Sequence, residues 1–186
     1  MVRLIFLDVD GVLALWRSQV AEGNATAHEL EKEGLLCLGA SADAAPPLER
    51  ACLEHLSYVV REAGASVILS STWREDPVLV GFLKAQLEKV GVAVDGVTPI
   101  HRNSGRGQEV LEYLDDGRQD VESFVIIDDE WMDSFESCGL GDRVVQTLMM
   151  SDDYLPGDGP IQRFDPAAGL TREKAEACLA VLRKPR

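Results

Sequence analysis

The stretch Leu4-Ile5-Phe6-Leu7-Asp8-Val9-Asp10-Gly11 joins an apolar run to two closely spaced acids. Residues 4–7 are continuously apolar, which is typical of a strand buried on both faces. Side chains at positions i and i+2 of a strand point to the same side, so Asp8 and Asp10 are expected to emerge together where this strand ends. Two like charges about 4 Å apart repel by ~4 kcal/mol at an effective dielectric constant near 20, and a divalent cation would relieve that repulsion.

The rest of the chain alternates apolar strands with amphipathic helices. Further strands are predicted at residues 66–69, 92–94, 123–127 and 143–148. Helices are predicted from Pro46 to Gly64, after Asp76, over residues 107–114 and after Thr171. This alternation indicates one α/β domain of 186 residues, with a parallel sheet covered by helices on both faces.

An irregular region of roughly 30 residues, about 14–45, separates the first strand from the first predicted helix. Loops of this length are uncommon in compact domains and are usually functional or carry small structure of their own. We therefore predict a flap or insert here, with a bare surface loop as the alternative. The run 151–165 is rich in Gly, Pro and Asp and is predicted to be a loop.

Composition limits the classes of partner. The formal net charge of −14 disfavours non-specific attraction to nucleic acid or to an anionic membrane, both of which call for basic surface. The four cysteines show no C-x-x-C spacing, so neither a zinc site nor a redox pair is indicated. Asp8 and Asp10 interrupt the apolar start, which argues against a signal peptide, and no apolar run reaches 18 residues. A cytoplasmic protein without a membrane partner is expected.

Polar residues also follow two of the other predicted strands. Ser70 and Ser71 come after residues 66–69, and Asp128 and Asp129 come after residues 123–127. In open α/β sheets the ligand lies beyond the carboxyl ends of the strands, so these side chains are expected to meet the two N-terminal acids. Serine hydroxyls and free backbone N–H groups suit phosphate, although they could also make turn hydrogen bonds. Mg²⁺ prefers a site that offers only a few carboxylate oxygens and leaves room for water molecules.

These motifs resemble those of the haloacid dehalogenase-like (HAD) superfamily. Its opening signature is Asp-x-Asp-x-(Thr/Val), with Val12 in the fifth position here, and Ser70 and Asp128-Asp129 match its second and acidic motifs. The resemblance implies a three-layer Rossmann-like sheet of strand order 5-4-1-2-3, with a small flap and no large cap. It also implies a Mg²⁺-dependent phosphatase acting through an aspartyl-phosphate.

The resemblance further implies a role for each residue. Asp8 would be the nucleophile and Asp10 the general acid and base; a dehalogenase lacks this second acid because a halide needs no proton. The implied metal ligands are Asp8, the Asp10 main-chain carbonyl, and Asp128 or Asp129, with Asp133 as the following acid. The implied phosphate ligands are Ser70, Ser71 and a basic residue, for which Arg106 fits best and Arg102 second, in place of the usual Lys.

The sequence does not identify the substrate, which could be a small phosphorylated molecule or the phosphorylated end of a macromolecule. Ser-Ser-Thr-Trp-Arg at 70–74 and Arg-Gly-x-Glu-Val-Leu at 106–111 resemble elements of HAD domains associated with RNA-repair proteins, which suggests a nucleic-acid end despite the acidic charge. The alternative to an enzyme is a non-catalytic scaffold that binds Mg²⁺ and phosphate. A receiver-type signalling domain is disfavoured. Its phosphoacceptor Asp ends the third strand, whereas no strand predicted before Asp128 ends in this way, and Asp8-x-Asp10 has the wrong spacing for that fold's acid pair.

Overall fold

A computed structural model describes residues 1–15, 25–38, 46–101, 104–116, 120–151 and 165–186. At its centre is a parallel sheet made of β1 (Val2–Leu7), β4 (Ala65–Leu69), β5 (Val94–Val97), β6 (Val121–Asp128) and β7 (Val144–Gln146), in the order β5-β4-β1-β6-β7. The predicted α/β class with a parallel Rossmann-like sheet is therefore confirmed, and the strand that carries Asp8 is central.

The strand labels differ from the expected 5-4-1-2-3 because two short strands, β2 (Leu36–Cys37) and β3 (Leu48–Glu49), come between β1 and β4 in the chain. They pair antiparallel in a separate ribbon and take no part in the main sheet. Counted in chain order among the sheet strands alone, the observed order is 3-2-1-4-5. This is the expected arrangement viewed from the opposite edge.

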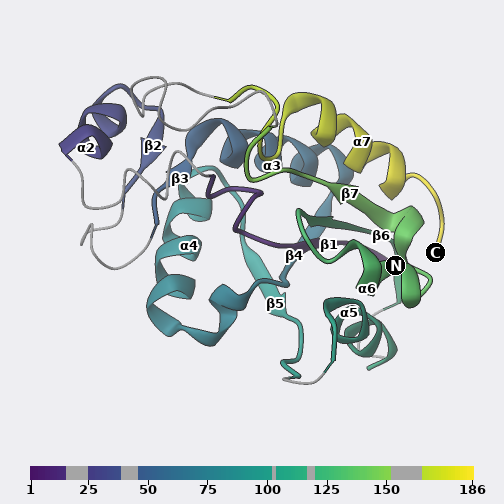
Figure 1. Ribbon diagram of the computed structural model, residues 1–186. Coiled ribbons are helices and arrows are strands. Elements are labelled where there is room, and N and C mark those ends of the chain that lie inside the picture. The colour runs from purple at the N-terminus through teal and green to yellow at the C-terminus, as the bar shows by residue number, and fades with distance from the viewer. Residues whose placement is uncertain (16–24, 39–45, 102–103, 117–119, 152–164) are drawn as a thin grey trace.

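Helices cover both faces of the sheet, with α3 and α7 on one side and α5 and α6 on the other (Figure 1). The helices are α2 (Ala25–Lys32), α3 (Arg50–Ala63), α4 (Pro77–Lys89), α5 (Arg106–Asp115), α6 (Met132–Ser137) and α7 (Arg172–Leu182), with 3₁₀ turns η1 (Thr72–Glu75) and η2 (Gly141–Arg143). Ile5 and Leu7 of β1 enter the core beneath α3, α4 and α7, whereas Leu4 and Phe6 enter the core beneath α5 and α6. Burial on both faces explains why residues 4–7 are apolar throughout.

Several boundaries differ from the predicted ones for local reasons. The first long helix begins at Arg50 and not at Pro46, because Leu48–Glu49 pairs with Leu36–Cys37 as a strand. Asp76 and Thr171 cap α4 and α7 as predicted, each accepting a backbone N–H with its side chain. Helices α2 and α6 carry too short an apolar pattern to be predicted.

Part of the region at 14–45 forms structure of its own, namely α2 and β2, while residues 16–24 and 39–45 lie outside the described part of the chain. The two-stranded ribbon of β2 and β3 contacts the loop that follows β1, because the backbone N–H of Glu49 donates to the carbonyl of Leu13 at 2.8 Å. Figure 1 shows α2, β2 and β3 beyond the end of the sheet toward which β1 runs. Within the described residues, no helix combines the length and apolar character that crossing a membrane requires.

Candidate active site

The carboxyl ends of β1, β4 and β6 lie side by side and bring the predicted motifs together. Leu7 is in register with Leu69 on one side and Ile127 on the other, so the next residues along each strand are Asp8, Ser70 and Asp128. The ladder continues one step further, because Ser70 N–H donates to the Leu7 carbonyl at 2.8 Å and Asp8 N–H donates to the Ile127 carbonyl at 3.0 Å. Backbone pairing therefore fixes where each motif begins.

Gly11 lets the loop after β1 turn tightly against the acidic motif of β6. Its φ is +69°, in the left-handed region, and its N–H donates to the Ala14 carbonyl at 2.8 Å. A Cβ at this position would lie 2.6 Å from the Cβ of Asp129 and would collide with its carboxylate as well. The absence of a side chain at residue 11 is therefore what allows Asp129 to reach Asp8.

Three carboxylates meet at this point. Asp8, Asp128 and Asp129 each offer an oxygen, and these oxygens lie within 4.8 Å of one another. Burial, reinforced by the Asp128 charge, raises the pKa of Asp8 to about 8. Burial and the same neighbour raise the pKa of Asp129 to about 6, and burial raises the pKa of Asp128. Grouped hard oxygens that resist ionisation without a cation fit a divalent metal ion.

The two acids at the end of β6 are held differently. One oxygen of Asp128 accepts the backbone N–H groups of Glu130 and Trp131 at 3.0 and 3.3 Å, so its carboxylate is anchored by the turn that follows the strand. Asp129 is more exposed and faces Gly11. Asp133 lies in the first turn of α6, exposed, and outside the group of three carboxylates.

The predicted phosphate ligands are buried beside the acids. Ser70, Ser71 and Arg106 are 1%, 0% and 5% exposed. The Ser71 hydroxyl hydrogen-bonds to Asp8 and thereby lowers its pKa, against the larger effect of burial. Ser70 Oγ and Arg106 Nη1 are buried without a hydrogen-bond partner among the described residues. A buried donor left in this way costs roughly 1–3 kcal/mol, and an anionic oxygen would satisfy both groups.

A buried ionic network positions Arg106. Glu109, one helical turn along α5, has its carboxylate 3.9 Å from Arg106 Nη1 and 2.6 Å from Arg74 Nη2. Arg74 also donates to the main-chain carbonyls of Ser71 and Pro99. The Arg74 side chain is only 2% exposed. The network links the loop after β4 to the helix that carries Arg106.

Sequence reasoning missed the roles of Glu109 and Trp73. The i,i+3 spacing of Arg106 and Glu109 on a helix was a usable signal for the first. For Trp73, whose indole Nε1–H donates to Asp10 Oδ2 at 2.9 Å, the sequence offers none, because the two residues are 63 positions apart. Arg102, the second candidate for the basic position, lies outside the described residues.

A hollow of about 440 Å³ adjoins the acidic motif and is lined by residues 130–134. The Trp131 ring, 41% exposed, forms part of this wall and lies with its centroid 5.8 Å from the Arg106 guanidinium carbon. The hollow therefore opens close to the Arg106 guanidinium.

One comparison with known proteins identifies a family. The sequence matches the family described as HAD domain in Swiss Army Knife RNA repair proteins, over residues 4–151. No protein of curated function matches it significantly. A solved structure of a candidate beta-phosphoglucomutase from Thermotoga maritima is similar, at 17% identity and a TM-score of 0.48, covering 97% of this chain and all of the other. Likeness of that degree carries no argument about function.

The family match spans most of the chain and includes Asp8, Ser70, Arg106 and Asp129, whose side chains the fold gathers at one end of the sheet. The protein belongs to the family of HAD domains found in Swiss Army Knife RNA repair proteins.

Proposed function

We propose that the protein is a Mg²⁺-dependent phosphohydrolase that works through an aspartyl-phosphate on Asp8. The observation that carries the proposal is the contrast between two adjoining groups in one buried site. Three carboxylates lie within 4.8 Å, and next to them Ser70 and Arg106 have polar atoms without hydrogen-bond partners among the described residues. The first group suits a cation and the second an anion, and a phosphate ester with Mg²⁺ supplies both.

The donor set fits magnesium. Asp8 and Asp129 would hold the ion together with the main-chain carbonyl of Asp10, and Asp128 supports them from the turn after β6. Bound there, Mg²⁺ would keep the acids ionised and offset the charge that builds up on the transferring phosphoryl group. A catalytic metal of this kind needs only a few protein ligands, since water and substrate complete its shell.

In the first step an oxygen of the Asp8 carboxylate attacks phosphorus, and the bond from phosphorus to the leaving oxygen breaks. Asp10 gives its proton to that oxygen, so the alcohol leaves neutral. In the second step water attacks phosphorus and passes a proton to the Asp10 carboxylate, while the bond from phosphorus to Asp8 breaks. Phosphate is released and both side chains return to their starting states.

The remaining residues bind the phosphoryl oxygens. Arg106 is close enough to Asp8 and Asp128 to lower the pKa of both, so a phosphoryl group between them would lie within its reach. The hydroxyls of Ser70 and Ser71 sit at the end of β4, next to Asp8. Holding the phosphate in this way fixes its distance from the nucleophile, which is the main contribution a protein makes to phosphoryl transfer.

The test is Mg²⁺-dependent phosphate release from p-nitrophenyl phosphate and from a panel of phosphate esters. Wild type is compared with Asp8→Asn and with Asp120→Asn, whose exposed side chain lies at the amino end of the sheet. We expect activity in wild type and Asp120→Asn only, with hydroxylamine-sensitive phosphorylation of Asp8 seen by mass spectrometry. No release from any ester, or equal release by Asp8→Asn, would favour the non-catalytic scaffold.

The family description favours a phosphorylated RNA end as the substrate class. The hollow beside Trp131 is large enough for more than a phosphate, and an exposed indole can stack on a base. The acidic charge of −14 works against binding a long polyanion, which points to the terminal nucleotide as the recognised part. Including 5′- and 3′-phosphorylated oligoribonucleotides in the panel, beside sugar phosphates, tests this preference.

A further inference from the structure

The hydrogen bond between Trp73 and Asp10 has a consequence for catalysis. We infer that Trp73 is a positioning residue, which orients the Asp10 carboxylate for proton transfer to the leaving oxygen. This inference rests on the proposed phosphatase function. The ring nitrogen of Trp73 donates to the Asp10 side chain, so the indole acts through that carboxylate.

The contact is directional. Indole has a single N–H donor and no acceptor, so its hydrogen bond to Asp10 Oδ2 at 2.9 Å has a fixed polarity. A carboxylate can otherwise rotate about its Cβ–Cγ bond over a broad range. The indole N–H, held in place, limits that rotation. The plane of the Asp10 carboxylate is therefore fixed before substrate binds. Preorganisation of this kind decides whether a general acid is within reach of its target.

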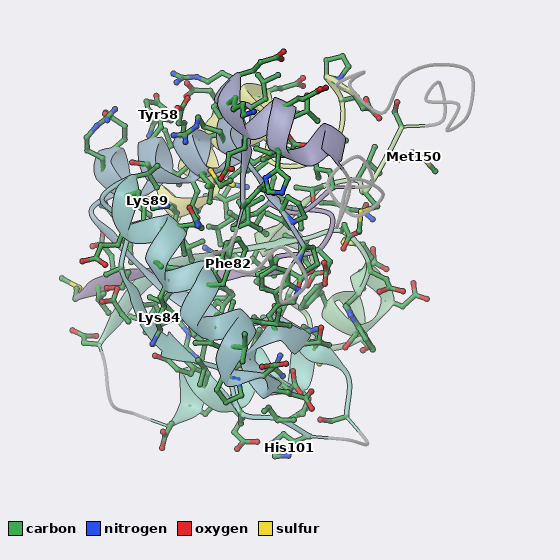
Figure 2. All side chains as sticks on the ribbon, turned by 90° about the vertical axis from the view of Figure 1, so that its left-hand side faces the viewer. Tyr58, Phe82, Lys84, Lys89, His101 and Met150 are labelled. Atoms are coloured by element: carbon green, nitrogen blue, oxygen red, sulfur yellow. The ribbon has the colours of Figure 1, made fainter. Side chains whose placement is uncertain are left out.

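The indole is itself firmly held. Trp73 is 3% exposed and lies in η1, whose N-cap Ser71 accepts the backbone N–H of Trp73. Its ring lies against Phe82 of α4, with centroids 6.4 Å apart and planes inclined by 31°. Helix α4 crosses the front of the view in Figure 2, where Phe82 is labelled together with Lys84 and Lys89.

The placement of Trp73 in the chain strengthens the inference. Ser70 and Ser71, the proposed phosphate ligands, directly precede the 3₁₀ turn that carries Trp73. One short segment therefore holds the phosphoryl oxygens with its hydroxyls and the proton donor with its indole. Because both contacts come from the same turn, the geometry between phosphorus and the donated proton is set by local structure.

A purely structural role predicts different kinetics. A buried indole N–H needs some acceptor, and Asp10 could merely serve that need. If Trp73 positions a general acid, replacing Trp73 must lower kcat/KM most for esters whose leaving group is basic. An alkoxide requires a proton on departure, whereas p-nitrophenolate does not. We expect Trp73→Phe to lower kcat/KM for an alkyl phosphate by ~10- to 100-fold, a part of what a general acid contributes, and for p-nitrophenyl phosphate by only about 3-fold.

The experiment measures kcat/KM for a series of phosphate monoesters graded by leaving-group pKa. This parameter reports formation of the phosphoenzyme, the step in which Asp10 donates. Phe82→Leu is the matched control, because it loosens the packing of the Trp73 ring without removing the N–H donor. We expect it to lower the melting temperature and to change the dependence on leaving group much less than Trp73→Phe does.

A double-mutant cycle with Asp10→Asn completes the test. If Trp73 acts through Asp10, Trp73→Phe adds nothing to the leaving-group dependence once the acid is gone. An equal loss of kcat/KM for every ester, or a Trp73→Phe effect that persists in the Asp10→Asn background, would overturn the inference. These outcomes differ from failure of the proposed function, in which wild type has no Asp8-dependent activity at all.

A second measurement leaves Trp73 in place, in case its replacement impairs folding. The chain has three tryptophans, so their ¹⁵N-labelled indole resonances can be assigned by substitution. We expect one indole proton to be shifted downfield and protected from exchange in wild type, and to lose both properties in Asp10→Ala. Three resonances that all stay unchanged in Asp10→Ala would show that Trp73 does not hold this carboxylate.

Discussion

Replacing Asp8 by Asn should abolish catalysis and yet stabilise the protein when no metal ion is present. Asp8 is 7% exposed, and burial together with the Asp128 charge raises its pKa to about 8. The folded protein therefore holds a proton on Asp8 across a pH range in which the unfolded chain has released it. As the pH rises from 4 to 8 without metal, the stability that the protonated group provides is progressively lost. Asparagine has nearly the same shape and carries no charge.

The size of the effect follows from the width of that pH range. The pKa of Asp8 rises from 3.8 to about 8. At about 1.4 kcal/mol for each pH unit, the full loss is on the order of 6 kcal/mol. For a domain of this size, ~2–4 °C per kcal/mol converts it to a difference in melting temperature of ~12–24 °C. We expect the advantage of Asp8→Asn to be near zero at pH 4 and largest at pH 8.

Thermal unfolding in EDTA, at several pH values between 4 and 8, checks this expectation. Asp120→Asn is the control, because its side chain is 82% exposed and its charge costs little to hold in the folded state. In Mg²⁺ the advantage of the variant at pH 8 should shrink, since the ion stabilises wild type and lacks one ligand in the variant. Equal melting temperatures of wild type and Asp8→Asn at pH 8 in EDTA would refute the argument.

Two further substitutions test how the site is held together. Gly11→Ala should weaken Mg²⁺ binding by roughly 10-fold or more, measured by calorimetry, because its Cβ would displace Asp129 and the residue would be strained at a φ of +69°; unchanged affinity would contradict the proposed site. Glu109→Ala should lower the free energy of unfolding by ~3–5 kcal/mol in urea titrations, because it leaves Arg74 buried and unpaired. Glu176→Ala, at an exposed ion pair, should lower it by less than about 1 kcal/mol, and similar losses in both variants would contradict the second prediction.

The sequence predicted those parts of the site that depend on strand order and local pattern. An apolar run ending in Asp8 identifies a buried strand, and Asp128 ends a second such run. Parallel pairing then places the ends of both strands at one edge of the sheet. The fold class and the meeting of the acids with Ser70 both follow from this single rule, without knowledge of any long-range contact.

The contacts that orient the site could not be predicted in the same way. Trp73 of η1 meets Asp10 from 63 positions further along the chain, and no periodic pattern encodes that contact. Glu109 reaches Arg74 across 35 residues. The start of α3 was misplaced for a similar reason, since pairing of Leu48–Glu49 with β2 overrides the helix signal at the two prolines.

The balance of charge in the site argues against a purely structural role. Burial raises the pKa values of Asp8, Asp128 and Asp129, and the Asp128 charge raises those of Asp8 and Asp129 further, so their grouping destabilises the folded state near neutral pH. A packing role would be served better by apolar side chains of similar volume. Nearby, Arg106 keeps a buried N–H without a hydrogen-bond partner among the described residues, although Glu109 lies 3.9 Å from the same atom. A cation and an anion bound side by side would relieve both deficits together, as the proposed magnesium ion and phosphate ester would.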